Sequence, residues 1–213
     1  MKIIEPSVEL VEDFDAAAIM RKLERAGRVC YKSEGNIKAD SAEKFIRGII
    51  KRGHESVIEH AAVSFKIICD RGVTHELVRH RIASYSQESS RYCDYSAGKF
   101  GGELTFIKPC FWREDDPNYR LWLETMAHVE ANYLALRAGG ARPEEARSIL
   151  PNSLKTEIFV TMNLREWRHF LRLRTAKAAH PQMREVALKI YAILAEKLPA
   201  VFDDLKPAEE VIT

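Results

Sequence analysis

The sequence lacks the features that mark membrane proteins and disulfide-stapled secreted proteins. It has no apolar run approaching the ~20 residues that span a bilayer. Acidic side chains occupy the opening stretch MKIIEPSVELVEDFD, where a signal peptide would need an apolar run. The four cysteines form no CxxC pair and no disulfide-like framework for a chain of 213 residues. We therefore expect a cytoplasmic protein with reduced thiols.

Neither sign of charge is in excess, and the common phosphate-binding loops are missing. The 33 Lys and Arg residues are balanced by 31 Asp and Glu residues, which gives a net charge of +2. Such a balance is not typical of a protein that coats nucleic acid or an acidic membrane. No GxGxxG and no P-loop motif occurs. Any anion must therefore be bound by a local cluster of cations.

Two histidine-containing segments resemble zinc helices, but their spacing is wrong. A zincin helix places its histidines at positions i and i+4, on one face of the helix. In HELVRH the i+4 position is Arg79, and His80 comes one residue later. In HESVIEH the i+4 position is Ile58. We therefore expect no metal.

The pattern of apolar residues predicts an α+β fold in a single domain that covers residues 1–213. Apolar residues make up 46% of the chain, which is enough for a core. Strands are predicted over 62–69, 104–108 and 154–162, and helices over 14–27, 40–53, 72–81, 118–138, 164–174 and 183–198. Because these elements show no regular βαβ order, we expect an antiparallel-type sheet packed with several helices.

Local signals place some of the helix ends. Asp40 and Glu43 resemble a capping box, and Gly27 and Gly53 are typical of C-terminal ends.

The segment RHRIASYSQESSRY, residues 79–92, concentrates cations and hydroxyls. Arginine for charge and serine for short hydrogen bonds suit a phosphate site, although a solvated basic helix end is the simpler alternative. Consecutive helical residues point about 100° apart. Arg79, His80 and Arg81 would then serve two parts of one ligand, or two sites shared across a subunit boundary. We therefore expect an oligomer with composite sites.

A second set of arginines lies on the helix predicted over 164–174. Arg165, Arg168 and Arg172 share one polar stripe, which is most simply a solvated face. Arg174 lies at the end of the helix and can reach elsewhere.

Arg79-His80-Arg81, seven further residues and Ser89 form the pattern RHRx7S. This pattern resembles the signature of the flavin-dependent thymidylate synthases. Four other segments resemble later or earlier blocks of that family in the right order: GHESVIEH (53–60), ARSILP (146–151), MNLREWRHFLRLR (162–174) and AAHPQMREV (178–186). The resemblance extends over nearly the whole chain, from about residue 20 to residue 200.

The resemblance implies reductive methylation of dUMP to dTMP. Methylenetetrahydrofolate would be the carbon donor, and FAD reduced by NADPH would be the hydride carrier. It also implies a homotetramer with active sites at subunit junctions. The balanced charge and the lack of a long apolar run separately predict no nucleic-acid or membrane partner. A folate- and flavin-dependent nucleic-acid methyltransferase and a non-catalytic nucleotide-binding module are the alternatives.

The resemblance also assigns residues. Those implied for dUMP are Glu76, Arg79, Gln87, Glu88, Ser89, Arg91, Arg147 and Arg174. Those implied for FAD are His54, Ser56, Arg79, His80, Arg81, Gln87, Asn163, Arg165 and His169. Arg174 is the expected catalytic group, since its guanidinium would stabilise the ionised pyrimidine.

The chain departs from the family pattern at two of these positions. Gln87 stands where many members carry a carboxylate, which leaves hydrogen bonding but puts an acid or base role in doubt. His169 stands where some members carry Asn. Ser89 is expected to bind rather than to attack, since His80 is its one candidate base and an unactivated serine is a poor nucleophile.

Overall fold

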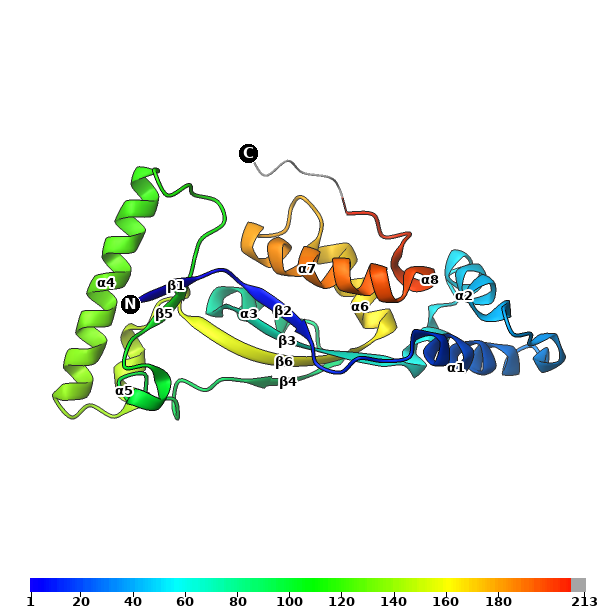
Figure 1. Cartoon of the computed structure of the whole chain (residues 1–213), viewed down its shortest axis with the longest axis horizontal. Helices are drawn as coiled ribbons and strands as arrows, with labels where there is room; N and C mark the ends of the chain where they lie inside the picture. The colour runs from blue at the N-terminus through cyan, green and yellow to red at the C-terminus, as the bar shows by residue number, and fades with distance from the viewer. Residues whose placement is uncertain (208–213) are drawn as a thin grey trace. The chain divides into compact units, whose positions relative to one another are not determined.

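The structure is a computed structural model that describes residues 1–207 (Figure 1). Helices and strands are interleaved along the chain, which confirms the predicted α+β class. The chain divides into two compact units. Unit 1 comprises Met1–Ser7, Ile67–Arg79 and Ser86–Phe159, and unit 2 comprises Val8–Lys66, His80–Tyr85 and the chain from Val160 onward. The expectation of a single domain stays a prediction.

The strands form one sheet of four strands and one of two. The larger sheet has the order β2-β3-β6-β4, and the smaller pairs β1 with β5. The strands are β1 (Lys2–Ile4), β2 (Ser7–Leu10), β3 (Ala62–Asp70), β4 (Ala83–Gln87), β5 (Thr105–Ile107) and β6 (Lys155–Asn163).

Strands β3 and β6 are antiparallel, as the sequence predicted. The amide of Leu164 donates to the carbonyl of Ala61 at 2.9 Å. The hydroxyls of Ser64 and Thr161 lie 2.8 Å apart, so a later residue of β3 faces an earlier residue of β6. By contrast, β1 and β5 are parallel, in a register that pairs Lys2 with Thr105.

Eight α-helices lie within the described residues. They are α1 (Ala16–Val29), α2 (Ser41–Lys51), α3 (Arg71–Leu77), α4 (Pro117–Ala138), α5 (Pro143–Ala146), α6 (Leu164–Arg174), α7 (Pro181–Lys197) and α8 (Pro199–Phe202). Short 3-10 turns are η1 (Glu34–Asn36), η2 (Glu55–His60), η3 (Gly98–Phe100) and η4 (Arg147–Ile149). No helix of this part of the chain has the length and apolar character needed to cross a bilayer.

Each unit has its own apolar core. The core of unit 1 joins α4 to the neighbouring strands and loops through Tyr95, Phe106, Met126 and Tyr133. In unit 2, α1 packs against α2, and α6 packs against α7 (Figure 1). The indole of Trp167 in α6 meets Phe65 of β3 edge-on, with ring centroids 5.2 Å apart.

The prediction of a helix over 72–81 was wrong at its C-terminal end. Helix α3 begins where Asp70 accepts a hydrogen bond from the amide of Val73, but it ends at Leu77. The signature triplet therefore lies outside the helix, and the divergence of its side chains has another cause. Arg79 and Arg81 are exposed, whereas His80 is buried.

Three strands were not predicted. Strands β1 and β2 are only three and four residues long, so they carry little periodicity. Strand β4 lies within the polar segment 79–92, where no strand was predicted. Its side chains alternate between exposed and half-buried positions, not between polar and apolar residue types. Just beyond the strand, the amide of Glu88 donates a hydrogen bond to the carbonyl of Glu157 in β6 at 2.8 Å.

Two of the predicted end signals have other roles. Asp40 precedes α2 but forms no side-chain cap, and the predicted capping box was therefore wrong. Gly27 lies inside α1, where a Cβ would come within 2.6 Å of the Phe45 ring. Gly53 follows α2 with a φ of +76°, as its predicted terminating role requires.

Candidate active site

His80 of the signature triplet is buried in unit 2, between two charged groups of α6. Its Nδ1 atom lies 3.1 Å from Oε1 of Glu166. Its Nε2 atom accepts a hydrogen bond from Nε of Arg174 at 3.2 Å. The ring also meets Phe170 edge-on, with centroids 5.1 Å apart. The triplet and the expected catalytic arginine are thus joined by a direct hydrogen bond.

The partners of His80 determine its protonation state. A carboxylate only accepts hydrogen bonds and a guanidinium only donates them. His80 must therefore carry a hydrogen on Nδ1 and a lone pair on Nε2, which is the neutral ring. Burial is the main cause that lowers the pKa of His80; Arg174 and His169 add to this, and Glu166 opposes it.

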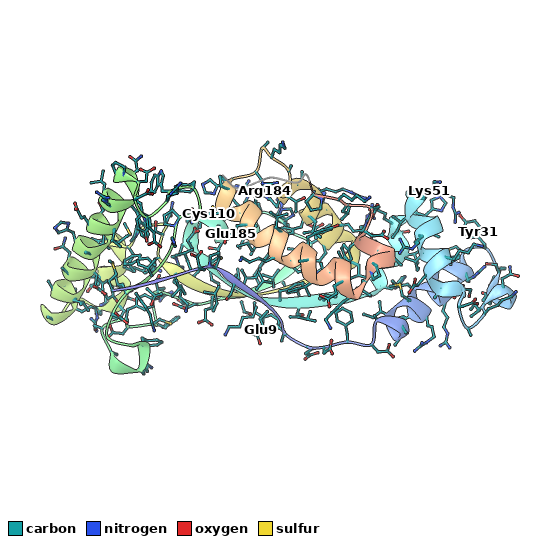
Figure 2. The ribbon with its side chains drawn as sticks, turned by 45° about the horizontal axis from the view of Figure 1, so that its top comes forward. Glu9, Tyr31, Lys51, Cys110, Arg184 and Glu185 are labelled. Atoms are coloured by element: carbon teal, nitrogen blue, oxygen red, sulfur yellow. The ribbon has the colours of Figure 1, made fainter. Side chains whose placement is uncertain are left out.

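Helix α6 holds these groups because both of its ends are fixed. At the N-terminus, the side chain of Asn163 accepts a hydrogen bond from the amide of Glu166 at 2.9 Å. In the middle, Nε1 of Trp167 donates to the carbonyl of Val63 at 3.0 Å. At the C-terminus, the buried Arg184 of α7 donates to the carbonyl of Thr175 at 3.0 Å (labelled in Figure 2).

Two neighbouring hollows in unit 2 contain most of the residues expected to bind FAD. One, of about 370 Å³, is lined by His54, Ser56 and Arg165. The other, of about 450 Å³, is lined by Asn163, Arg165 and His169. The first also contains Tyr31 (labelled in Figure 2), whose hydroxyl lies 3.4 Å from Nδ1 of His54. Arg165 belongs to both hollows.

Two acidic side chains of these hollows, Glu55 and Glu59, are paired with arginines. Glu55 accepts a hydrogen bond from Arg172 at 2.6 Å and one from Arg168 at 3.2 Å. Burial acts to raise the pKa of Glu55, but the two arginines together bring it below its ordinary value. Arg165 pairs in the same way with Glu59.

Arg168 corrects the predicted polar stripe of α6. Arg165 and Arg172 are exposed, as a solvated face requires, but the side chain of Arg168 is 0% exposed. Its guanidinium forms a bidentate ion pair with the carboxylate of Asp204, with N–O distances of 2.6 and 2.7 Å. Its position between two exposed arginines gave no sign of this burial.

The donor set of the two hollows fits a flavin dinucleotide. The guanidinium of Arg165 and the hydroxyl of Ser56 are groups that bind phosphate oxygens. The imidazoles of His54 and His169 offer flat rings beside them, and the amide of Asn163 adds a hydrogen-bonding group. Arg81 lies outside these linings, exposed and next in sequence to His80.

The spacing of three groups in unit 2 would also suit a metal ion. One ligand atom from each of His80, Glu166 and His169 lies within 4.8 Å of the others. Both ring nitrogens of His80 are already engaged, however, and one of them faces the cation Arg174. The expectation of no metal stays a prediction.

The residues expected to bind dUMP, apart from Arg174, lie in unit 1, and Gln87 is held there by two threonines. Its Nε2 donates to the hydroxyl of Thr74 at 3.0 Å and to that of Thr156 at 3.2 Å. The Thr74 hydroxyl itself donates to the carbonyl of Arg71, so it can only accept from Gln87. The carbonyl of the Gln87 amide is thereby turned away from both threonines.

Glu88 and its neighbours form a second, half-buried network. The hydroxyl of Tyr95 donates to one oxygen of Glu88 at 2.6 Å, and Nζ of Lys155 donates to the other at 2.8 Å. Burial and the hydrogen bond to Glu88 raise the pKa of Tyr95. Glu88 therefore serves as an acceptor within unit 1.

Ser89 makes a local bond instead of a bond to a base. Its Oγ accepts from the amide of Arg91 at 3.3 Å. The side chain of Arg91 is exposed and lies 3.8 Å from Glu144 of α5, and the exposed Arg147 follows that helix directly. Glu76 is half-buried in α3, and its carbonyl accepts from the amide of Arg79.

The sequence did not point to several partners in these networks. Glu166, Thr74, Thr156 and Lys155 were not among the expected residues. The one available signal was Asn163 followed by Glu166, the spacing of a capping box, which predicts a helix start and no site.

Comparisons with known proteins identify the family of this chain. The family model described as thymidylate synthase complementing protein matches residues 11–200. A relative from Pyrococcus furiosus named flavin-dependent thymidylate synthase is 41% identical over 172 residues, which is 80% of this chain and 68% of that protein. The chain belongs to this family. The resemblance of the signature and its flanking blocks is therefore confirmed.

Two further matches cover almost the whole chain. The relative of the same name from Mycobacterium avium is 36% identical and covers 95% of this chain and 85% of its own length. A solved structure, a UMP/dUMP methylase PolB from Streptomyces cacaoi bound with 5-Br dUMP, superposes with a TM-score of 0.78 at 25% identity. That comparison covers 95% of this chain and 96% of the other.

Proposed function

We propose that this member of the flavin-dependent thymidylate synthase family methylates dUMP to dTMP. The hydrogen bond between His80 of the signature and Arg174 of the later block carries this proposal. It joins the motif that names the family to the guanidinium expected at the pyrimidine. The names of the relatives, and the dUMP analogue bound by the methylase from Streptomyces cacaoi, support the same substrate.

The expected residues of unit 1 bind the nucleotide. Arg91 and Arg147 are exposed cations and Ser89 supplies a hydroxyl, which suits a phosphate that carries about two charges. Gln87 presents its amide carbonyl, since its nitrogen is held by Thr74 and Thr156. It can accept a hydrogen bond from the base or the sugar, but it cannot act as an acid.

Arg174 stabilises the charge that develops on the pyrimidine. Reaction at C5 requires enolate-like charge on the ring, and a guanidinium beside N3 and O2 offsets it. An aligned donor of this kind is worth several kcal/mol. Arg174 is held for this role by the hydrogen bond from its Nε atom to Nε2 of His80.

Ser89 binds rather than attacks. Its candidate base was His80, but both nitrogens of that ring are engaged by Glu166 and Arg174. A serine without a base is a poor nucleophile. The bond of its Oγ with the amide of Arg91 supports a role in shaping the loop that receives the phosphate.

The cofactor side uses His54, Ser56, Asn163, Arg165 and His169. FAD, reduced by NADPH, supplies the hydride when it is bound, and methylenetetrahydrofolate supplies the carbon. The groups of the protein bind and orient these molecules. Arg79, His80, Arg81 and Gln87 complete the set that the resemblance implies. The protein works in the cytoplasm as a homotetramer with active sites at subunit junctions.

An absorption spectrum of the purified protein tests this function. A flavin band should be present or should appear with added FAD. It should bleach with NADPH under anaerobic conditions and return when dUMP and methylenetetrahydrofolate are added, with dTMP as product. A protein that takes up no FAD, or a reduced flavin that the two substrates do not reoxidise, would contradict the proposal.

A further inference from the structure

We propose that Glu166 is a positioning residue for Arg174, acting through the ring of His80. Glu166 fixes the hydrogen of His80 on Nδ1, and the lone pair left on Nε2 then holds the guanidinium. This inference rests on the proposed function, since it concerns how Arg174 is held for its reaction. Glu166 is not among the residues that the family resemblance implies.

The geometry supports a chain of three groups. Oε1 of Glu166 lies 3.1 Å from Nδ1, and Nε of Arg174 lies 3.2 Å from Nε2. The carboxylate can only accept and the guanidinium can only donate, so one tautomer satisfies both contacts. A carboxylate that selects a histidine tautomer in this way is a recurring device of active sites.

Glu166 departs from the role that its position predicts. It lies in the first turn of α6, three residues after the N-cap Asn163, where a glutamate commonly reaches back to the N-cap amide. Here the carboxylate is buried against His80 instead. The N-terminal end of a helix favours its negative charge, and the C-terminal end favours the charge of Arg174.

The other groups around His80 do not replace Glu166. His169 and Phe170 of α6 meet the ring at centroid distances of 5.6 and 5.1 Å. From β4, the hydroxyl of Tyr85 donates to the backbone carbonyl of His80 at 2.6 Å. Glu166, His169 and Arg174 are therefore the titratable or charged groups that face the imidazole itself, with Tyr85 at its backbone.

Without Glu166, the His80 ring would no longer be restricted to the tautomer with its hydrogen on Nδ1. A hydrogen on Nε2 would face the N–H of Arg174. Two donors would then meet, and the hydrogen bond between His80 and Arg174 would be lost. Protonation of the ring has the same effect. The pKa of His80 lies below its ordinary ~6.5, and activity should fall as the pH drops through it. Because Glu166 opposes this lowering, removal of its charge should move the acid limb to lower pH.

The experiment compares Glu166→Ala and Glu166→Gln with the unaltered protein. Glu196→Gln in α7 is the matched control, since Glu196 is exposed. Turnover per bound flavin is measured against pH, with KM for dUMP. The Ala variant should lose about tenfold in kcat, the effect of one lost hydrogen bond. The Gln variant should keep most of its kcat, through its amide oxygen, with the acid limb at lower pH.

A second measurement is independent of turnover. The ¹⁵N resonances of the His80 ring distinguish the two neutral tautomers. The unaltered protein and the Gln variant should show the hydrogen on Nδ1, and the Ala variant should show a mixture. Unchanged tautomer and kcat in the Ala variant would overturn the proposal. So would an equal loss in both variants with an unmoved acid limb, which indicates a structural role.

These outcomes are separable from a failure of the proposed function. If the unaltered protein forms no dTMP although it binds FAD, the function is wrong. The tautomer measurement still decides whether Glu166 fixes His80. If the unaltered protein is active and the Ala variant matches Glu196→Gln at every pH, only the positioning role is wrong.

Discussion

The replacement Arg168→Met tests the ion pairs that hold α6 to its surroundings. Arg168 is fully buried, and its guanidinium binds the carboxylates of Glu55 and Asp204 and the carbonyl of Val201. Methionine keeps much of the volume but removes all of these donors. The variant leaves three acceptors of unit 2 without this partner.

The structure sets the size of the effect. Breaking a buried ion pair by removing one partner costs about 3–5 kcal/mol. We expect the low end, about 3 kcal/mol, because Glu55 keeps Arg172 at 2.6 Å and Asp204 is 50% exposed and can be hydrated. For a chain of this size that lowers Tm by roughly 6–12 °C.

Thermal unfolding at one fixed protein concentration is the assay, since assembly also affects Tm. The matched control is Arg172→Met, which removes a cation from the same Glu55. Arg172 is 46% exposed, so its loss should cost less than about 1 kcal/mol. Equal shifts for the two variants, or less than ~2 °C for Arg168→Met, would refute the reasoning from burial.

Three further predictions concern the nucleotide site and unit 1. Arg174→Ala should reduce dTMP formation by about 10²–10³-fold while bound flavin remains; normal turnover would exclude its role. Ser89→Ala should raise the dissociation constant of dUMP and leave some turnover, whereas complete loss with unchanged dUMP binding would indicate a nucleophile. Arg137 holds the pKa of Asp94 well below its usual range. Their ion pair therefore stabilises unit 1 fully at pH values above the unfolded pKa of ~3.9, and this stabilisation is lost as the pH falls through the lower pKa of the folded state. In urea titrations, Asp94→Asn should be less stable than the unaltered protein at neutral pH and should match it in strong acid; a pH-independent difference would contradict the pair.

The sequence predicted the elements that have strong local signals. Helix α6 appears where Asn163 precedes a stripe of Trp167, Phe170 and Leu171, and its bounds match the prediction from Leu164 to Arg174. Strands β3 and β6 follow their alternating apolar residues. In these cases the local pattern and the packing agree, and the structure follows the pattern.

The elements that were missed depend on distant partners. Directly after β4, the amide of Glu88 donates to the carbonyl of Glu157 in β6. No local pattern predicts a strand that is polar on both faces. Strand β1 depends likewise on Phe106 and its neighbours in β5. Short strands of this kind are specified by the sheet that they join.

The candidate site shows the same division. The family resemblance indicated His80 and Arg174, but the sequence did not predict the hydrogen bond between them. Glu166 had the spacing of a helix cap, and its contact with His80 depends on the path of the chain between α3 and β4. Motifs identify the groups that perform chemistry, whereas the groups that hold them depend on the fold.

The ion pairs of α6 link the stability of unit 2 to the cofactor site. Arg168 and Arg172 bind Glu55, which begins η2 between the expected flavin residues His54 and Ser56. The same contacts that fix α6 therefore fix the loop that carries those two side chains. Arg168→Met should then lose flavin affinity together with stability. Arg174→Ala should leave flavin affinity unchanged, because the hydrogen bond that it removes joins Arg174 to His80. A variant of Arg168 that is less stable but binds flavin as before would show that the loop is positioned by other contacts.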